Sequence, residues 1–483
     1  MSRLVVGPFN RVEGDLDIAL ELDQGRVASA RVNSTLYRGF EAMLVGKPAL
    51  DALVYTPRIC GICSVSQSVA CATALAQALG VTPAANGHLC HNLLLANETL
   101  TDILTHFYLF FMPDFARECY TGQPWHSHVL SRFQAVKGSA TREVLPARAE
   151  FLHLMGLLAG KWPHTLSIQP GGSTRPVQRQ ERLRLLAIVN GFRRFLERTT
   201  FGDDLERIAS IETRDQLESW RAEQHWQHDD LRTFLHVSEQ LGLETLGRAT
   251  DRFMSFGNYP DGDGGLHVPQ GIWSGGQVQA LDHDLIREDI SHAWMQPAPS
   301  LHPRQGRTEP VAEKAEAYSW CKAPRLGNQV VETGALARAL VAGQPLMAEL
   351  VSSRGGSVHT RILARMLELA RMVPQLEQWI RMLEPGQPFC HHPERIRDGQ
   401  GAGLMEAARG SLGHWIEVHK GRISHYQIIA PTTWNFSPRD EQGQPGALEQ
   451  ALEGVPVAAG DTDPVTVQHV VRSFDPCMVC TVH

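Results

Sequence analysis

Two pairs of cysteines with the spacing of metal ligands lie near opposite ends of this sequence of 483 residues. The first pair is Cys60 and Cys63. The second pair is Cys477 and Cys480, and the chain ends three residues later at His483. Four thiolates on one centre would give a soft, sulfur-rich site of the kind that selects zinc, iron–sulfur clusters or other thiophilic metals. Such a site would also join the two ends of the chain in one core.

Three kinds of site are compatible with the cysteine pairs alone. A thioredoxin-like redox pair is the least favoured, because neither motif lies in a βαβ unit. A structural zinc site usually joins cysteines that are close in sequence, whereas more than 400 residues separate these two pairs. A catalytic metal centre in the middle of the fold is the third interpretation.

The first pair directly precedes a predicted helix. Ser64 and the residues up to Gln67 have the spacing of a capping box. The run that follows is rich in Ala and Leu as far as Leu79, and Gly80 and Pro83 end it. The N-terminal end of a helix lowers the pKa of a nearby thiol, and so favours the thiolate that binds metal.

The rest of the chain predicts a mostly helical α+β protein. Residues 15–22 and 26–36 alternate as strands around a turn at 23–25. We expect one domain over residues 1–483, with an N-terminal β region (1–42), a helical body (43–383) and a C-terminal region (384–483) that closes the metal site. Apolar residues at helical intervals occupy 88–111, 143–158, 180–196, 336–347 and 359–383. Long irregular segments are expected at 258–276, 297–309, 384–403 and 437–446.

Composition excludes several classes of protein. A net charge of −7 and a pI near 6.3 argue against a surface for nucleic acid or anionic membranes. No apolar run approaches the roughly 18 residues of a membrane span. The nine cysteines are an odd number, and only the two pairs have ligand spacing, which argues against a disulfide framework and for a reducing compartment. The glycine run at 399–403 does not have the spacing of a nucleotide-binding loop.

The motifs around and between the cysteines resemble the large subunit of [NiFe]-hydrogenases. Both cysteine motifs match in their flanking residues, and further segments follow in the order of the family from residue 11 to residue 483. These segments are Arg11–Gly14, Tyr37–Glu41, Arg58–Cys63, Lys161–His164, Gln169–Gly172, Trp320–Arg325, Glu406–Gly410, His414–Trp415, Pro431–Asn435 and Asp475–His483.

The resemblance implies the large-subunit fold and a nickel–iron centre whose iron carries CO and cyanide ligands. By matching position, Cys60 and Cys477 would be terminal ligands of nickel, while Cys63 and Cys480 would bridge to iron. It also implies a small partner subunit that holds all the Fe–S clusters, maturation proteins that insert the metals, and H2 as the substrate.

Further ligands follow from the same resemblance. The Glu41 carboxylate, the Ile428 carbonyl and His483 would hold Mg²⁺, a hard ion that prefers oxygen ligands and keeps several waters. Pro431 and Thr432 match residues that accommodate a cyanide ligand.

The resemblance also assigns roles in H2 cleavage, which needs a base for the proton. Glu13 matches the proton-relay glutamate of the family. Arg409 matches an arginine above the open metal position, where it would act with Asp114 and Asp475 on H2. Without the motifs, Glu13 would be interpreted as a surface carboxylate at a strand edge and Arg409 as a loop cation.

Three departures from the common family pattern resemble the H2-sensing, or regulatory, subgroup. Gln67 stands where most members carry histidine, Ile62 where valine is usual, and Phe110 where leucine is common. The bulk of Ile62 and Phe110 would narrow the path of gas toward the metals, so that H2 passes and O2 is hindered. The absence of residues after His483 also matches this subgroup.

We therefore expect a cytoplasmic H2 sensor with low turnover that forms a heterodimer and signals to a histidine kinase. The alternative is an energy-conserving uptake hydrogenase of the same chemistry. A non-catalytic relative of the respiratory quinone-reductase subunits is less favoured, because all four cysteines are retained.

Overall fold

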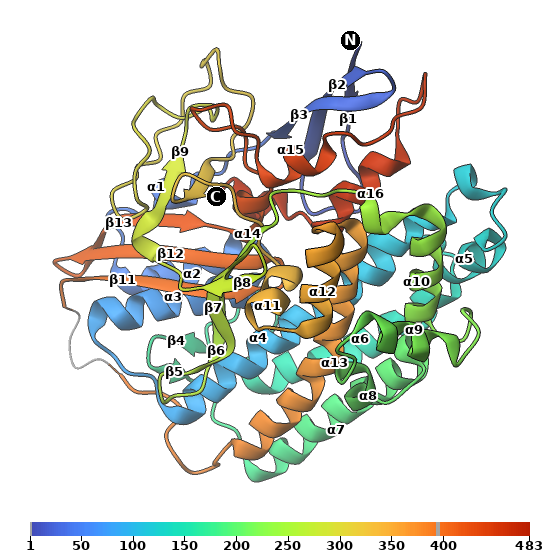
Figure 1. Ribbon diagram of the computed structural model, residues 1–483. Coiled ribbons are helices and arrows are strands. Elements are labelled where there is room, and N and C mark those ends of the chain that lie inside the picture. The colour runs from blue at the N-terminus through green and yellow to red at the C-terminus, as the bar shows by residue number, and fades with distance from the viewer. Residues whose placement is uncertain (1, 393–396) are drawn as a thin grey trace.

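The computed structural model describes residues 2–392 and 397–483. Long helices form the body of the molecule, and small antiparallel sheets lie around and between them (Figure 1). The prediction of a mostly helical α+β fold is confirmed. The division into three regions stays a prediction. Positions 393–396, within a segment predicted to be irregular, lie outside the described residues.

The elements have the following bounds. The first half contains β1 (Ser2–Val6), β2 (Leu16–Asp23), β3 (Arg26–Ser34), α1 (Phe40–Leu44), α2 (Ala52–Tyr55), α3 (Ser64–Leu79), α4 (Ala85–Thr105), α5 (His126–Phe133), α6 (Ser139–Ala159), β4 (Ile168–Gln169), β5 (Gly172–Ser173), α7 (Arg179–Phe195), α8 (Leu205–Ala209), α9 (Arg214–Ala222) and α10 (Asp230–Leu241). The second half contains β6 (Arg252–Pro260), β7 (Leu266–Ser274), β8 (Gln277–Gln279), β9 (Ile286–Asp289), β10 (Ala323–Leu326), α11 (Ala335–Val341), α12 (Pro345–Arg354), α13 (Val358–Met382), β11 (Gly399–Ala407), β12 (Gly410–His419), β13 (Arg422–Ile429), α14 (Pro431–Asn435), α15 (Ala447–Leu452), α16 (Val465–Ser473) and α17 (Met478–Thr481).

The N-terminal sheet has the strand order β1-β2-β3 with antiparallel neighbours. The predicted hairpin of β2 and β3 is confirmed, and Gln24 and Gly25 adopt the left-handed backbone conformation that a tight turn needs. Leu16, Ile18 and Leu20 alternate along β2 and are fully buried. One face of this sheet therefore packs on the core.

Strand β11 packs directly on α3, the helix that follows the first cysteine pair. Glycines at alternate positions of β11 face the helix, where added Cβ atoms would lie 1.9–2.2 Å from its carbonyl oxygens. The prediction that residues 399–403 are irregular is therefore wrong, because these glycines allow close contact and do not form a turn. Gly399, Gly401 and Gly403 face Ala78, Ala74 and Ala70, respectively.

Two other predicted segments differ in outcome. Residues 258–276 were expected to be irregular, but β6 and β7 form an antiparallel hairpin over most of them, with Gly- and Pro-containing strands. Residues 437–446 lie outside helices and strands, as predicted. The helix predicted at 88–111 is α4, which continues into a π-helical segment, His106–Phe111. Such segments are rare and occur frequently at functional sites.

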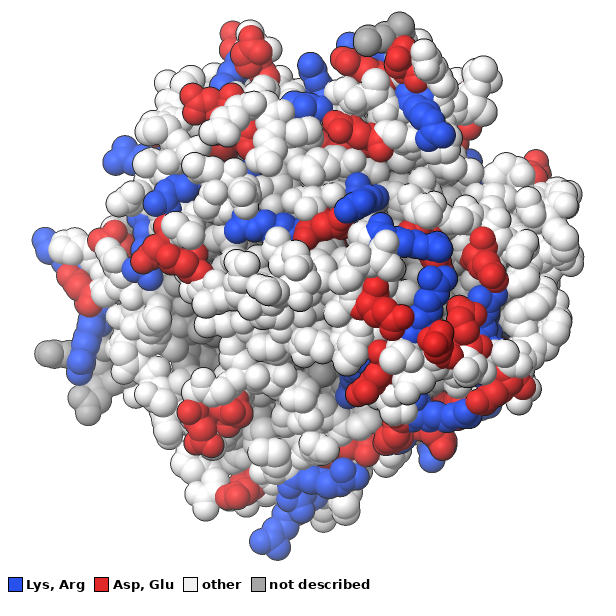
Figure 2. Space-filling model, viewed as in Figure 1, with Lys and Arg blue, Asp and Glu red and all other residues white. Residues whose placement is uncertain are grey.

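The surface agrees with the sequence-based exclusions. Acidic and basic side chains are interspersed on the face seen in Figure 2, so no broad area of one sign covers it. In the described part of the chain, no helix combines the length and apolar character needed to cross a membrane.

A segment near the N-terminus meets the C-terminal segment inside the molecule, although in Figure 1 the N-terminus itself lies at the outer edge and the C-terminus lies within the outline. Glu13 and Cys477 form a parallel β-bridge. The amide of Glu13 donates to the Pro476 carbonyl at 3.3 Å, and the amide of Met478 donates to the Glu13 carbonyl at 2.7 Å. Backbone pairing between the N-terminal and C-terminal segments thus positions the second cysteine pair.

Candidate metal centre

The four cysteines predicted to share one site are gathered at one buried point. Their sulfurs all lie within 4.8 Å of one another. The Sγ atoms of Cys60 and Cys477 are 3.5 Å apart, and those of Cys63 and Cys480 are 3.2 Å apart. Each pair of facing sulfurs thus combines one cysteine from each end of the chain.

The first pair is carried by a rigid element. Cys63 is the N-cap residue of α3, and its sulfur makes no capping hydrogen bond. Because β11 packs closely against α3, the position of this helix is fixed along much of its length. Gly61 lies between the cysteines of the motif, and its backbone is free of the steric limits of a side chain.

The second pair lies at α17, a helix of only four residues, with Cys477 as its N-cap and Cys480 within it, and other segments hold this pair in place. The Arg38 guanidinium donates to the Val479 carbonyl at 2.6 Å and to the carbonyl of Ile59, which precedes Cys60. The Arg38 amide also donates to the Val482 carbonyl at 2.9 Å. Arg38 therefore ties both cysteine motifs together.

Helix α14 provides a further contact to the second pair. The Thr432 hydroxyl accepts a hydrogen bond from the Cys477 amide at 3.0 Å. Pro431 is the first residue of α14, and both residues are buried. They lie beside the sulfur site, as the resemblance requires, while their contact with a cyanide ligand stays a prediction.

A cluster of charged residues lies beside the cysteines. The Arg409 guanidinium contacts the Asp102 carboxylate at 2.5 Å and the Asp475 carboxylate at 3.2 Å. Burial would lower the pKa of Arg409, but Asp102 and Asp475 outweigh it and hold this pKa well above its usual range. Burial raises the pKa of Asp102 to about 7, against the lowering effect of Arg409. Arg409 is thus a fixed cation within a buried triad.

Glu13 lies at the edge of this cluster and is only partly buried. Burial raises the pKa of its carboxyl group, the negative charge of Cys60 raises it further, and Arg409 lowers it. The carboxyl group is therefore close enough to Cys60 and Arg409 to interact with their charges.

Asp114 does not take the place expected for it. Its carboxylate contacts the Arg472 guanidinium at 2.7 Å and also the Arg11 guanidinium, and His469 lies 3.6 Å away. Arg409 pairs instead with Asp102, on α4. The expected contact of Asp114 with Arg409 is therefore corrected: the sequence offers a carboxylate at each position, and only the packing of α4 shows which one faces the arginine.

A second set of predicted ligands is also brought together. The His483 Nε2 atom lies 2.7 Å from the Ile428 carbonyl oxygen and 3.4 Å from the Glu41 carboxylate. The other ring nitrogen, Nδ1, lies 2.5 Å from the Cys480 carbonyl. A neutral ring that donates from Nδ1 leaves a lone pair on Nε2 facing two oxygens. A cation among these three groups would satisfy them all, so the residues fit a hard ion.

Lys322 and Glu288 complete the surroundings of this second site. The Lys322 ammonium lies 3.1 Å from Glu41 and 3.4 Å from Glu288. Burial opposes ionisation of Glu41, but Lys322, His483 and Thr308 lower its pKa to about 2. Within the described residues, neither oxygen of Glu288 has a hydrogen-bond partner. Glu288 and Lys322 line a cavity of about 420 Å³ that would hold water.

The residues predicted to mark the subgroup are placed as follows. The Gln67 Oε1 atom accepts a hydrogen bond from His414 Nε2 at 2.8 Å, and the His414 Nδ1 atom accepts one from the Tyr426 hydroxyl at 2.8 Å. Ile62 and Phe110 are both partly buried. Phe110 lies in the π-helical segment, and its carbonyl accepts a hydrogen bond from Arg11 at 3.0 Å.

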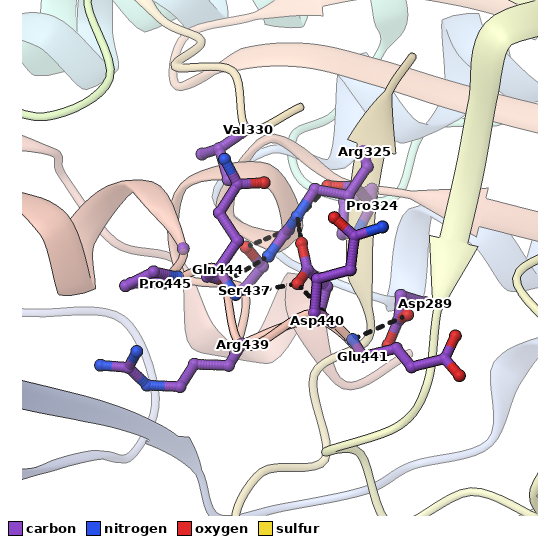
Figure 3. A network of polar contacts seen from close by, with 12 residues as sticks. Asp289, Pro324, Arg325, Val330, Ser437, Arg439, Asp440, Glu441, Gln444 and Pro445 are labelled. Atoms are coloured by element: carbon purple, nitrogen blue, oxygen red, sulfur yellow. Dashed lines mark hydrogen bonds and ion pairs between the residues drawn. The ribbon is translucent and has the colours of Figure 1, made fainter. Parts of the chain in front are cut away.

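A buried network anchors the segment that follows α14 (Figure 3). The Arg325 guanidinium donates to the Asp440 carboxylate at 2.8 Å and to the Ser437 hydroxyl at 3.1 Å. The other Asp440 oxygen accepts from the Gln444 amide at 2.9 Å. The network therefore fixes residues 437–446 although they form no regular element.

Comparison with known proteins identifies the family. The model of the nickel-dependent hydrogenase family matches residues 38–117 and 141–483. The chain belongs to this family. The large subunit of the periplasmic [NiFeSe] hydrogenase of Desulfomicrobium baculatum is 29% identical to it, with 100% of this chain and 95% of that protein covered. The uptake hydrogenase large subunit of Rhodobacter capsulatus is 26% identical, with the same coverage.

The fold of a nickel-dependent hydrogenase large subunit is confirmed by a solved structure. The reduced Ni-Fe-Se hydrogenase of D. vulgaris Hildenborough superposes with a TM-score of 0.85 and 27% sequence identity, with 100% of both chains covered. Four buried cysteine sulfurs fit the soft metals of this family. Large subunits of hydrogenases pair with a small Fe–S subunit.

Sequence reasoning missed three residues that hold the hydrogenase site together. Asp102 is one of several polar residues in the second half of α4, after Glu98 and Thr101, so the sequence gives no distinct signal for it. Arg38 and Lys322 lie inside segments that resemble the family, Tyr37–Glu41 and Trp320–Arg325. Their contacts reach residues more than 250 positions away, so sequence spacing gives no indication of the partners.

Proposed function

We propose that this hydrogenase chain activates H2 at a nickel–iron centre and serves mainly to sense H2. The observation that carries the proposal is the convergence of four buried thiols, from both ends of the chain, beside the cation of Arg409. A structural zinc site would not require a buried arginine held by two carboxylates at its side.

The four cysteines would hold the two metals, with Cys60 and Cys477 on nickel and Cys63 and Cys480 shared with iron. The group that they bind would supply the Lewis acid that polarises H2. Arg409 would contribute a fixed positive charge, since Asp102 and Asp475 hold its guanidinium from two sides. A preorganised charge of this kind costs no reorganisation during the reaction.

Glu13 would carry the proton away from the site. Its backbone is hydrogen-bonded to both neighbours of Cys477, which fixes the carboxyl group near the cysteines. It is also partly buried and not enclosed, so a proton taken from the site would have a way out of the large subunit. Asp475, the other carboxylate that contacts Arg409, would keep the guanidinium in place.

A hydrated Mg²⁺ would lie between Glu41, the Ile428 carbonyl and His483. The position of His483 Nε2 between two oxygens supports this ion, and bound waters would also reach the Glu288 oxygens, which have no hydrogen-bond partner among the described residues. Pro431 and Thr432 would adjoin the cyanide ligands of iron, for which their position beside Cys477 is the support.

Metal analysis and infrared spectroscopy of the purified complex with its small subunit would test the proposal. We expect about one nickel per large subunit, together with CO and cyanide stretching bands. Zinc alone without such bands would refute a hydrogenase centre in this chain.

The role in sensing is supported by Gln67, Ile62 and Phe110, which resemble the regulatory subgroup. A cytoplasmic location, low turnover, a histidine kinase partner and the maturation proteins belong to the same proposal. Replacing Ile62→Val together with Phe110→Leu should make H2 oxidation more sensitive to O2, because the two smaller side chains would widen the path of gas. Equal activity of the double variant and the wild type after exposure to air would contradict this role.

An energy-conserving uptake role is the second candidate, favoured by the full-length similarity to the uptake hydrogenase of Rhodobacter capsulatus. Turnover distinguishes the two. H2 oxidation at rates sufficient for growth on H2 would favour uptake, and slow oxidation coupled to a change in kinase phosphorylation would favour sensing.

A further inference from the structure

Helix α3 begins at the first cysteine pair without a cap from its own sequence. Cys63 occupies the N-cap position, and its carbonyl accepts the first bond of the helix, from the Gln67 amide at 3.1 Å. A side chain at this position would normally accept a hydrogen bond from an amide of the first turn. The Cys63 sulfur instead lies 3.2 Å from the sulfur of Cys480.

Glu98, on the neighbouring helix α4, supplies the missing acceptor. One carboxylate oxygen accepts from the Val65 amide at 2.8 Å, and the other accepts from the Ser66 amide at 2.8 Å. The Ser66 hydroxyl donates to the same carboxylate at 2.8 Å, and the Trp162 indole donates at 3.3 Å. The two amides are N2 and N3 of α3, the positions that an N-cap side chain serves.

We propose that Glu98 is a positioning residue that caps α3 from outside and thereby frees the Cys63 sulfur to bind metal. A serine, threonine or aspartate at the N-cap would satisfy the helix but could not serve as a thiolate ligand there. A cysteine at the N-cap would leave two amides unpaired if no other acceptor were present. The carboxylate of Glu98 removes this conflict.

The surroundings of Glu98 keep it in one position. Its side chain is buried, at 3% exposure, and all four of its hydrogen-bond partners are donors. Burial raises its pKa to about 8 against the lowering effect of these donors. In either protonation state, at least one oxygen remains an acceptor for an amide of α3.

Helix α4 also carries Asp102, four residues after Glu98 and therefore on the same face of the helix. Asp102 holds Arg409, while Glu98 holds the start of α3. One face of α4 thus places two parts of the site relative to each other: the first cysteine pair and the buried arginine. This inference rests on the proposed function, because it assigns Glu98 a role toward the metal centre.

Glu449 offers a matched comparison, since it is also a buried carboxylate at a helix start. It accepts from the Val32 amide at 3.0 Å and from the Gly446 amide at 3.3 Å, and it caps α15. Its partners, Val32, Gly446 and Tyr318, do not belong to the helix that follows the first cysteine pair. If Glu98 had a purely structural role, substitution of Glu98 and substitution of Glu449 would have the same effect on the infrared bands of the CO and cyanide ligands.

The test uses the purified complex with the small subunit, in the variants Glu98→Ala, Glu98→Gln and Glu449→Gln. Hydrogen exchange of a peptide covering residues 60–68 should be about tenfold faster in Glu98→Ala, because loss of a cap weakens the first turn by about that factor. Glu98→Gln should show a smaller increase, since its amide keeps one acceptor oxygen. Glu449→Gln should leave this peptide at the wild-type rate.

Infrared bands of the CO and cyanide ligands provide the second readout. We expect displaced bands in both Glu98 variants and wild-type bands in Glu449→Gln, at whatever nickel occupancy each variant retains. Wild-type bands in both Glu98 variants, or equal displacement in Glu449→Gln, would overturn the inference. If Glu98→Ala does not fold, the same comparison is made with Glu98→Gln.

The two proposals fail in different ways. A wild-type complex without CO and cyanide bands would refute the proposed function. In that case the hydrogen-exchange comparison alone decides whether Glu98 caps α3, and unchanged exchange would refute the cap as well.

Discussion

The two cysteine pairs perform the same task on very different supports. Cys60 and Cys63 precede a helix of 16 residues that is buried along nearly all of its length. Cys477 is the N-cap of a four-residue helix at the end of the chain, and Cys480 lies within that helix. The first pair therefore precedes a long buried helix that other segments hold in place, whereas the second pair has little local structure and depends on contacts from elsewhere.

The contacts to the second pair come from both halves of the sequence. Glu13 pairs with its backbone, Arg38 binds its carbonyl groups, and Thr432 accepts from the Cys477 amide. Because a short terminal helix has little stability of its own, the second pair depends on these contacts to keep its place. The comparison teaches that the site joins a pair beside a long buried helix to a pair that remote contacts hold.

The largest effect is expected from replacing Arg38, whose guanidinium joins the two cysteine motifs. Arg38→Ala leaves the partly buried carbonyls of Ile59 and Val479 without their donor, at a cost of about 3–6 kcal/mol for two bonds to a charged group. Nickel content of the purified complex should fall, and hydrogen exchange of residues 474–483 should rise more than that of residues 60–68.

Arg422→Ala is the matched control for Arg38→Ala. The Arg422 guanidinium also donates to a backbone carbonyl, that of Gly46 at 2.8 Å, but this contact lies on the surface. It should change neither nickel content nor exchange at either cysteine pair. Equal loss of protection at both pairs in Arg38→Ala would show that the second pair does not depend more on remote contacts.

Asp102 and Asp114 give the next comparison, because the structure places only one of them against Arg409. Asp102→Asn should lower H2 oxidation about 100-fold at unchanged nickel content, since a misplaced arginine shifts the charge beside the site. Asp114→Asn should leave the activity of the folded complex near that of the wild type. It should instead lower thermal stability, because Arg11 and Arg472 would lose their buried counter-ion. Activities that fall in the reverse order would restore Asp114 as the partner of the site.

The contrast between local signals and remote contacts also explains which features could be predicted from the sequence. The helix α3 and its end at Gly80 follow from local signals and are confirmed. The capping box predicted at Ser64–Gln67 is wrong, because Cys63 is the N-cap and the amides of the first turn donate to Glu98 on α4. The four cysteines were predicted from spacing and from family resemblance, and the structure gathers them. The partner of Arg409 could not be chosen, because Asp102 lies 307 positions before it and nothing local links the two.

The glycines of β11 show a different limit. A run of glycines is typical of a loop, and the pattern predicted an irregular segment there. The structure uses the same residues for contact with Ala70, Ala74 and Ala78 of α3, which are themselves small. Neither run alone indicates the contact, since complementarity between two segments becomes visible only when both are placed.

A smaller effect is expected from disturbing the support of the first pair. Gly401→Ala would place a Cβ atom 1.9 Å from the Ala74 carbonyl oxygen, so β11 and α3 must move apart. We expect a loss of about 2 kcal/mol in the free energy of unfolding, as for other overpacked contacts. Gly191→Ala in α7 is the control, because a Cβ atom there meets no neighbour within 4 Å. It should be neutral or slightly stabilising. Wild-type stability of Gly401→Ala would show that α3 is not held by this contact.

The smallest effect concerns the layer behind the second pair, where α15 packs against α16, the helix that leads to Asp475 and Cys477. Burial raises the pKa of Glu449 to about 7 from its ordinary value of 4.5. A carboxyl group with a raised pKa in the folded state stabilises the fold fully below pH 4.5, and this stabilisation is lost as the pH rises toward 7. Between pH 5 and 7 the free energy of unfolding of the wild type should therefore fall by about 1 kcal/mol per pH unit through this group.

The variant Glu449→Gln cannot titrate at this position, so its free energy of unfolding should fall less steeply over that range when unfolding is followed in denaturant at several pH values. Parallel stability curves for the two proteins would show that titration of Glu449 does not make the packing of α15 against α16 sensitive to pH. The support that this packing gives to the second pair would then not depend on Glu449 either.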